Sequence, residues 1–347
     1  MRIDYNKNTL DVFRLIATVQ VFLGHVITQF YMQNPPVNLI YFVRGVPILF
    51  ALCGFLAAKS LEGRRVKEWW IGRAARIVPG LWACIILNTI IIALVYETKP
   101  TFIEGATYAV TQFFGLNFYT GDWLRGYGVG TPNGVLWTIS VQIQFFALAP
   151  LIQKLLAKRK LQVGLITVGL LTLASIACNM AEPYLPEMAN KLIGVTVVPY
   201  LYFLVAGMVV WYHRDAIIPA LKKAKWFILV AYVAWKLMEN HLAFPHTVDG
   251  ILYNTVTTLL MCAVIFAFSF LGSWRMRRDY TFGFYLYHMV FVNLVYHFGF
   301  ATLVPLWKGA LTVLGVSVVT LLCAVLSKRF VEDPAARLLT KRGRKNG

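Results

Sequence analysis

The sequence predicts an all-α, polytopic membrane protein with about ten transmembrane helices. Composition is the first reason, because 59% of the 347 residues are hydrophobic, only 14% are charged and the mean hydropathy is +0.64. Soluble domains are more polar than this. The second reason is that apolar runs recur along the chain at close to the length, roughly 20 residues, at which a helix crosses a bilayer. The third is that strongly basic connections alternate with connections that hold few basic residues.

Ten apolar runs support the predicted count. They cover residues 10–32, 43–58, 77–96, 134–156, 161–181, 192–212, 226–238, 251–271, 282–304 and 307–327. The run at 226–238 is the weakest prediction, because it is short and has Lys236 near its end. We expect residues 1–340 to form a single integral-membrane domain and residues 341–347 to form a basic, solvated cytoplasmic tail.

The distribution of basic residues predicts the orientation of these helices. With ten spans both termini lie on one side of the membrane, and 27 of the 33 Lys and Arg residues fall on that side. Because basic connections stay in the cytoplasm, we expect cytoplasmic termini and an external connection at 97–133. The same distribution accounts for the net charge of +18, so nucleic acid is not an expected partner.

The first run carries two ionisable side chains on one helical face. Arg14 and His25 are eleven positions apart, which is about three turns and about 16 Å along a helix. Ionisable groups inside a bilayer are costly and usually functional. A neutral His can act as a general base near pH 7. The alternative is a buried His that is hydrogen-bonded to a neighbouring helix.

A second basic pair stands just before the third run. Arg73 and Arg76 have the spacing of neighbours on one helix face. Guanidinium groups suit bidentate binding of phosphate. The pair therefore predicts either an anionic ligand or lipid headgroups as its partner, since cytoplasmic connections are basic in any case.

The predicted external connection at 97–133 is longer than most connections. Its end combines Tyr119, Trp123 and Tyr127 with glycines and polar residues. Flat aromatic rings beside hydrogen-bonding groups suit a sugar-like acceptor. An interfacial aromatic belt is the alternative interpretation of the same residues.

His288 is a second His within an apolar run, and the default interpretation of His25 applies to it as well. No pair of His residues has metal-ligand spacing with an acidic or Cys partner. The five cysteines lie in apolar runs without CxxC spacing. We therefore expect no catalytic metal.

Six segments, taken together, resemble the acyltransferase-3 family of bacterial membrane O-acyltransferases. Arg14 and His25 match the family's Arg and His separated by ten residues, and Arg73 and Arg76 match its RxxR motif. The other four are ILFALCGFLAAKS, NGVLWTISVQIQFFALAPL, FGFYLYHMV and FVEDP, which are similar to the family's FFxxSGFLI, NGxLWTLxVExQFYLLxPL, YxxYLxH and FxExP. They occur in family order over residues 10–334, which is nearly the whole chain.

The resemblance implies a multi-pass enzyme of the bacterial cytoplasmic (inner) membrane. Such an enzyme moves an acyl group, commonly acetyl, from cytoplasmic acyl-CoA to a hydroxyl of a cell-envelope glycan or lipid-linked sugar. Acyl-CoA, commonly acetyl-CoA, is then a co-substrate, and no bound cofactor is expected. His25 would deprotonate the acceptor hydroxyl, while the anionic part of acyl-CoA would bind Arg14, Arg73 and Arg76. The matching segments also supply candidate site-lining residues, which are Trp137, Gln142, Tyr285 and His288.

Two alternatives stay open. Gln142 stands where the family usually has Glu. Because Gln cannot take up a proton, this departure allows a catalytically inactive member of the family. The other alternative is a ten-helix secondary transporter or exporter of an anionic or glycan substrate. The absence of Gly- or Pro-broken helices in matched halves argues against it, and binding of acyl-CoA would distinguish a transferase from a carrier.

Overall fold

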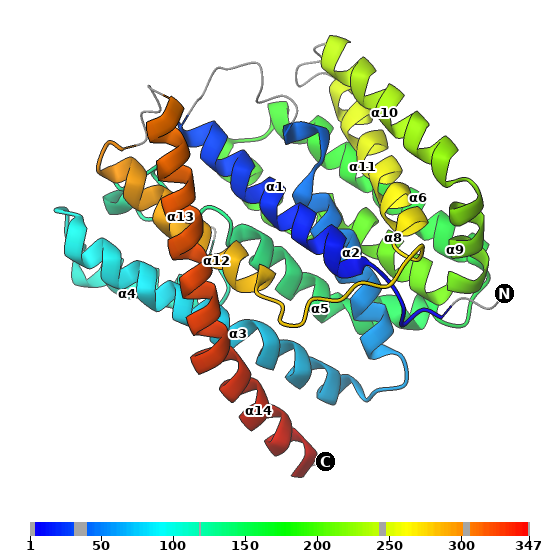
Figure 1. Cartoon of the computed structure of the whole chain (residues 1–347), viewed down its shortest axis with the longest axis horizontal. Helices are drawn as coiled ribbons and strands as arrows, with labels where there is room; N and C mark the ends of the chain where they lie inside the picture. The colour runs from blue at the N-terminus through cyan, green and yellow to red at the C-terminus, as the bar shows by residue number, and fades with distance from the viewer. Residues whose placement is uncertain (1–3, 31–39, 118, 243–247, 301–305, 346–347) are drawn as a thin grey trace. The chain divides into compact units, whose positions relative to one another are not determined.

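The computed structural model describes residues 4–30, 40–117, 119–242, 248–300 and 306–345. Every regular element in these ranges is helical (Figure 1), which confirms the predicted all-α class. The helices group into two compact units, each assembled from separate stretches of chain. Unit 1 consists of Met1–Val19, Tyr41–Arg64 and Val141–Arg277, and unit 2 consists of Gln20–Ile40, Arg65–Ser140 and Arg278–Gly347. Because the units interleave in sequence, the single domain over residues 1–340 stays a prediction.

Two helices contribute to both units, since the boundaries fall inside α1 (Leu10–Phe30) and α5 (Trp137–Leu156). Unit 1 also holds α2 (Gly45–Leu61), α6 (Leu161–Ala181), α7 (Glu187–Gly194), α8 (Leu201–Tyr212), α9 (Arg214–Lys223), α10 (Lys225–Leu242) and α11 (Val248–Phe268). Unit 2 also holds α3 (Val66–Val95), α4 (Phe102–Phe113), α12 (Thr281–His297), α13 (Leu306–Ser327) and α14 (Asp333–Lys345).

Seven helices of the described chain are long and apolar enough to cross a membrane, or eight if α7 and α8, bent by 48° between them, count as one span. They cover Leu10–Phe30, Ile40–Leu61, Val66–Val95, Trp137–Leu156, Leu161–Tyr184, Ile251–Phe268 and Trp307–Leu339. The predicted runs at 226–238 and 282–304 also form helices, but α10 carries three charged residues and α12 has 17 residues. A multi-pass membrane protein is therefore confirmed, while the count of ten stays a prediction.

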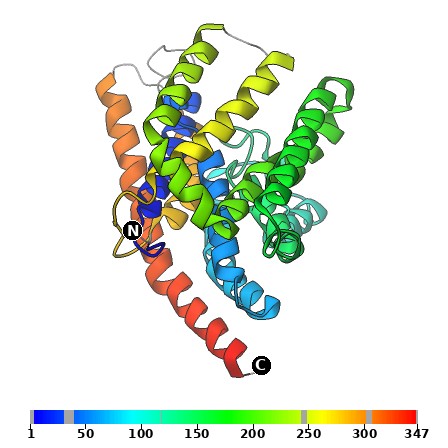
Figure 2. The same cartoon turned by 90° about the vertical axis from the view of Figure 1, so that its right-hand side faces the viewer.

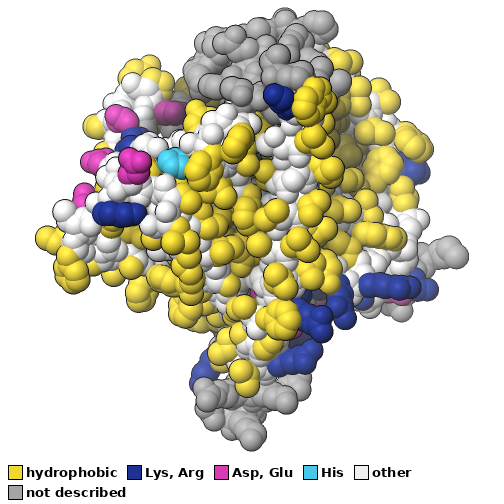
Figure 3. Space-filling model, turned by 60° about the vertical axis from the view of Figure 1, so that its left-hand side comes forward, with side chains coloured by type: hydrophobic (Ala, Val, Ile, Leu, Met, Phe, Trp, Pro, Cys, Tyr) yellow, Lys and Arg dark blue, Asp and Glu magenta, His cyan; other side chains and the backbone are white. Residues whose placement is uncertain are grey.

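Outward-facing apolar side chains in unit 2 fit contact with lipid. On α13 the side chains of Leu311, Leu314 and Leu322 are all more than half exposed. Figure 3 shows the apolar surface in yellow, with Lys and Arg gathered toward the end at which α14 lies. Large exposed apolar surfaces are rare on soluble proteins and mark interaction with membranes or partners.

Two predicted boundaries were wrong. Helix α3 begins at Val66, earlier than the apolar run at 77–96, because its first turns contain Lys, Glu and Arg, which are good helix formers but not apolar. Hydropathy marks the edge of the membrane and not the start of the helix. The run at 192–212 was predicted as one helix, but the chain bends between α7 and α8, where Pro199 removes a backbone donor.

The predicted external connection at 97–133 contains a helix that the sequence analysis did not predict. Helix α4 begins with a capping box, in which the Glu104 N–H donates to Thr101 Oγ1 (3.3 Å) and the Thr101 N–H donates to the Glu104 carboxylate (2.8 Å). These hydrogen bonds hold the pKa of the Glu104 carboxyl below its ordinary value. The Thr-x-x-Glu pattern is visible in the sequence and would have located this helix.

Unit 1 is built around the crossing of α2 and α8. A Cβ atom at Gly54 would lie 1.8 Å from the Leu204 carbonyl oxygen, and one at Gly207 would lie 2.1 Å from the Ala51 carbonyl oxygen. Only glycine permits this approach, and small residues at helix crossings are a common way to pack helices in membranes.

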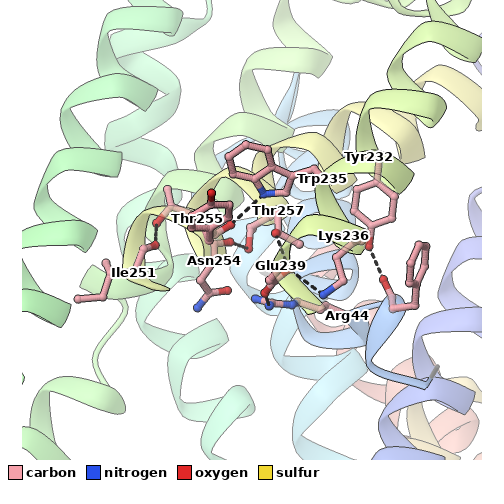
Figure 4. Close-up of polar contacts among 12 residues, drawn as sticks. Arg44, Tyr232, Trp235, Lys236, Glu239, Ile251, Asn254, Thr255 and Thr257 are labelled. Carbon is pink, nitrogen blue, oxygen red and sulfur yellow. Dashed lines mark hydrogen bonds and ion pairs between the residues drawn. The ribbon is translucent and has the colours of Figure 1, made fainter. Parts of the chain in front are cut away.

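A partly buried group of charges links three helices of unit 1 (Figure 4). The Glu239 carboxylate accepts hydrogen bonds from Lys236 Nζ (2.8 Å) and Thr257 Oγ1 (3.0 Å) and pairs with Arg44, which precedes α2. The side chain of Lys236 is only 3% exposed, so its charge requires a partner. The Lys that weakened the predicted run at 226–238 is thus accommodated by an ion pair.

In unit 2, helix α3 packs against the connection between α13 and α14, and helix α12 packs against α13. Figures 1 and 2 show α14 continuing from α13, through a five-residue π-helical turn, Lys328–Glu332. A Cβ atom at Gly80 on α3 would lie 3.2 Å from the side chain of Glu332, and one at Gly283 on α12 would lie 3.0 Å from Ala324 Cα. This tightly packed group includes the helices that carry Arg73, Arg76, Tyr285 and His288.

Candidate functional site

Two histidines that the sequence placed 263 positions apart lie side by side in unit 2. The ring of His25 on α1 is 5.4 Å from the ring of His288 on α12, measured between centroids. Phe22, one turn before His25, packs edge-on against His288 at 5.9 Å. The structure therefore brings the two predicted intramembrane histidines into one site.

The hydrogen bonding of His288 determines what this residue can do. It is fully buried, and its Nδ1 lies 3.3 Å from the Phe284 carbonyl oxygen. Because a carbonyl oxygen only accepts, Nδ1 carries the proton, and Nε2 of the neutral ring is an acceptor. Among the described residues Nε2 has no hydrogen-bond partner. A buried acceptor without a partner is unusual and calls for an explanation.

Side-chain hydrogen bonds fix helix α12 around His288. Tyr285, which is buried, shares a hydrogen bond of 2.8 Å with Thr138 on α5. The Leu286 carbonyl oxygen accepts from Asn133 Nδ2 (2.9 Å) and Cys84 Sγ (3.3 Å). The turn of α12 that precedes His288 is thus anchored to α3 and to the start of α5. The predicted site residue Trp137 is the first residue of α5 and is half-buried.

Asn293 is a further residue of this site that the sequence analysis missed. It is fully buried on α12, donates to the Thr131 and Pro132 carbonyl oxygens (2.8 and 2.9 Å) and accepts from the Val129 N–H (3.2 Å). Gly128, with φ +55°, lies against the same side chain, since a Cβ there would be 2.7 Å from Asn293 Oδ1. An Asn inside an apolar run was the signal available in the sequence.

The three aromatic residues predicted on the acceptor side lie in different environments. Tyr119 is 42% exposed. Trp123 is half-buried, 5.9 Å from the Tyr108 ring. Tyr127 is fully buried beside His297, at 5.2 Å between ring centroids, and burial raises the pKa of its phenol to about 12. Their role in binding an acceptor stays a prediction.

The two arginines of the RxxR segment lie on α3, well inside the helix, in unit 2. The Arg73 guanidinium lies over the buried Trp69 ring at 5.4 Å. Arg76 is exposed and pairs with Asp279 at 3.5 Å. Asp279 also accepts hydrogen bonds from the backbone N–H and the hydroxyl of Thr281, where α12 begins. Arg76 is therefore tied to the helix that carries His288.

A strongly basic pocket of about 400 Å³ lies in the same unit. Its lining includes Arg278, Tyr280, Lys328, Arg329, Asp333 and Arg337. In the sequence these cations indicate only the orientation of the helices, because they come from two stretches of chain that are about 50 residues apart. Asp279, the partner of Arg76, stands between two of the lining residues.

Arg14 and Gln142 belong to unit 1. Arg14 pairs with Asp11 at 3.3 Å, and Asp11 in turn accepts from the Met276 N–H at 3.1 Å. Gln142 is half-buried on α5. Within the described ranges no three His, Cys, Asp or Glu side chains lie close enough to hold a metal ion. The roles of Arg14 and Gln142 stay predictions.

Comparison with known proteins gives a consistent result. Residues 7–329 match the family model of the acyltransferase-3 family, which describes an acyltransferase domain. The chain is 25% identical to Nodulation protein 10 of Rhizobium leguminosarum bv. viciae, over 96% of this chain and 95% of that protein. It is 23% identical to the Peptidoglycan O-acetyltransferase OatA of Listeria monocytogenes serovar 1/2a, over 84% of this chain but only 50% of that protein. No solved structure matches the chain.

Proposed function

The chain belongs to the acyltransferase-3 family of membrane O-acyltransferases, and we propose that it moves an acetyl group from cytoplasmic acetyl-CoA to a hydroxyl of a cell-envelope glycan or lipid-linked sugar. A relative named as a peptidoglycan O-acetyltransferase supports both the acetyl group and the glycan acceptor. The family match argues against the transporter alternative. The excess of basic residues on the side of the termini supports a cytoplasmic location for the arginines of α3.

His25 is the general base in this proposal, and its position beside His288 is the observation that carries it. A His base directs the lone pair of one ring nitrogen at the acceptor hydroxyl, and its other nitrogen carries a proton that needs an acceptor. His288 Nε2 is an acceptor of this kind, without a partner among the described residues, on the ring that lies beside His25. His288 would thus be a positioning residue that fixes the tautomer of His25.

The proposed reaction is a single acyl transfer. His25 takes the proton of the acceptor hydroxyl while the oxygen of that hydroxyl attacks the thioester carbonyl carbon. A C–O bond forms, the C–S bond breaks, and CoA leaves as a thiolate that takes the proton back from the His25 imidazolium. The guanidinium groups of Arg73 and Arg76 hold the anionic part of the donor by charge-assisted hydrogen bonds.

Transfer in membrane vesicles tests this function. Inverted vesicles containing the protein receive acetyl-CoA with an isotopically labelled acetyl group, and ester-linked label on envelope glycans is measured by mass spectrometry. We expect label only when the protein is present and only when acetyl-CoA reaches the cytoplasmic face, so right-side-out vesicles are the control. Labelling would also exclude the inactive alternative raised by Gln142. No labelling of any glycan or lipid-linked sugar in inverted vesicles would refute the proposal.

A further inference from the structure

The basic pocket of unit 2 has the size and the charge of a site for a phosphorylated ligand. Its volume of about 400 Å³ falls within the range of roughly 300–1,000 Å³ that small-molecule sites occupy. It is formed where the segment before α12 meets the π-helical turn and the start of α14. The two walls come from distant parts of the sequence, so the pocket exists only in the folded protein.

The charge of the lining is strongly unbalanced. Four cationic side chains and one carboxylate, that of Asp333, line the pocket, and this carboxylate lies 3.1 Å from Lys328 Nζ. Lys328 also lies 3.7 Å from Glu332. The three arginines Arg278, Arg329 and Arg337 thus add positive charge that exceeds the acidic groups of the lining. The planar guanidinium group of arginine can donate two parallel hydrogen bonds to the oxygen atoms of a phosphate group.

The pocket is physically connected to the candidate site. Asp279 stands between the lining residues Arg278 and Tyr280 and pairs with Arg76 of the RxxR segment. Helix α12 begins directly after Tyr280 and carries His288 two turns further on, about 12 Å along the helix axis. A ligand with its phosphates in the pocket could therefore extend a flexible arm along α12 toward the two histidines.

We propose that this pocket binds the 3′-phosphate end of the acyl-CoA donor. The inference rests on the proposed function, in which acetyl-CoA is the donor, and adds the position of its nucleotide. The 3′-phosphate is a dianion that lies at the far end of CoA from the thioester. Arg278 and Arg337 bind its oxygen atoms, while the Tyr280 ring offers a face on which the adenine base can stack. Arg73 and Arg76 contact the rest of the anionic part.

Binding of two donors to the full-length protein tests this assignment. The protein is purified into nanodiscs of phosphatidylcholine, and its affinities for acetyl-CoA and for 3′-dephospho-acetyl-CoA are measured by equilibrium dialysis. The test variant is Arg278→Gln/Arg337→Gln. The control is Arg275→Gln/Arg277→Gln, which removes the same charge from neighbouring exposed positions outside the pocket lining. The thermal unfolding midpoint of each variant checks that it is folded.

We expect the wild type and the control to bind acetyl-CoA at least about tenfold more tightly than the dephospho analogue, the effect of one charge-assisted hydrogen bond. The pocket variant should lose this preference, bind the dephospho analogue as the wild type does, and reach the wild-type kcat with a raised KM for acetyl-CoA. Equal affinities of the wild type for both donors would overturn the assignment. A folded pocket variant that retains the preference would overturn it as well.

The same chemistry could be supplied by an anionic lipid headgroup, and a second measurement separates the two sources. Native mass spectrometry counts the phosphatidylglycerol molecules that each protein retains from mixed nanodiscs. A pocket variant that loses bound phosphatidylglycerol but keeps its preference for the 3′-phosphate would show that the pocket is a lipid site and contradict the proposal. Failure of the proposed function is distinguishable, because the wild type would then bind neither donor.

Discussion

Replacing Asn293 with Leu tests whether α12 holds the connection that precedes α5. The Asn293 amide is fully buried and makes three hydrogen bonds to this connection, to the carbonyl oxygens of Thr131 and Pro132 and from the Val129 N–H. Leucine fills a similar volume but leaves the Thr131 carbonyl and the Val129 N–H without this partner. The Pro132 carbonyl keeps a hydrogen bond from Asn88 at 3.1 Å. Each unsatisfied group costs about 1–3 kcal/mol. Because the connection can shift so that water partly satisfies both groups, we expect the free energy of unfolding to fall by about 2–4 kcal/mol.

The loss can be measured as the shift in unfolding of purified protein in mixed micelles with increasing SDS, followed by tryptophan fluorescence. Asn293→Asp puts a carboxylate oxygen against the Thr131 and Pro132 carbonyl oxygens at a fully buried position, so it should lose at least as much stability as Asn293→Leu. The matched control is Asn190→Leu, because its hydrogen bond to the Glu182 carbonyl oxygen is exposed and replaceable by water, and its second one, to the Leu185 carbonyl oxygen, is long at 3.5 Å. We expect the free energy of unfolding of this control to lie within about 0.5 kcal/mol of the wild-type value. An Asn293→Leu protein as stable as the control would refute the reasoning.

Three further predictions concern packing, the donor site and the orientation. Gly54→Ala should lower the free energy of unfolding by about 1–3 kcal/mol, because its methyl group would meet the Leu204 carbonyl oxygen. Gly169→Ala, where the space is open, should not lower it, and equal stability of the two would contradict the packing argument. Arg76→Ala should weaken acetyl-CoA binding in equilibrium dialysis by about 1.5–3 kcal/mol. Arg76→Lys should recover only part of the affinity for acetyl-CoA. Unchanged affinity of Arg76→Ala would show that Arg76 does not bind the donor and marks only the orientation of the helix. A single Cys placed within 119–130 of a cysteine-free variant should react with an impermeant maleimide from outside the cell, and reaction from the cytoplasm alone would overturn the orientation.

The sequence predicted helices best where a long apolar run had clear ends. The predicted run at 161–181 coincides with helix α6, Leu161–Ala181, because basic residues precede it and a Pro follows closely. Prediction was poorer where a helix leaves the membrane, as at the start of α3, since charged residues are good helix formers. Helix α4 was missed because its helical signal is a capping box and not an apolar run. Hydropathy finds membrane spans and not helices as such.

The candidate site was predicted residue by residue but not as an arrangement. His25 and His288 were each identified because an ionisable group in an apolar run needs a reason to be there. Their contact depends on the packing of α1 against α12 within unit 2, which no local pattern encodes. The basic pocket was missed for a related reason. Charges at 278 and at 328–337 look like ordinary cytoplasmic residues until the fold places them around one cavity.

Acetyl transfer by a His25→Gln protein tests the central claim most directly. Gln keeps the ability to form hydrogen bonds but cannot accept the proton at neutral pH. Because general-base catalysis is typically worth 10²–10⁴-fold, transfer at saturating acetyl-CoA should fall by at least about a hundredfold. Affinity for acetyl-CoA should stay unchanged, since the proposal assigns the charges of the donor to the arginines and not to His25. Near-normal transfer by this protein would contradict the account, remove His25 from the role of base and transfer that role to His288.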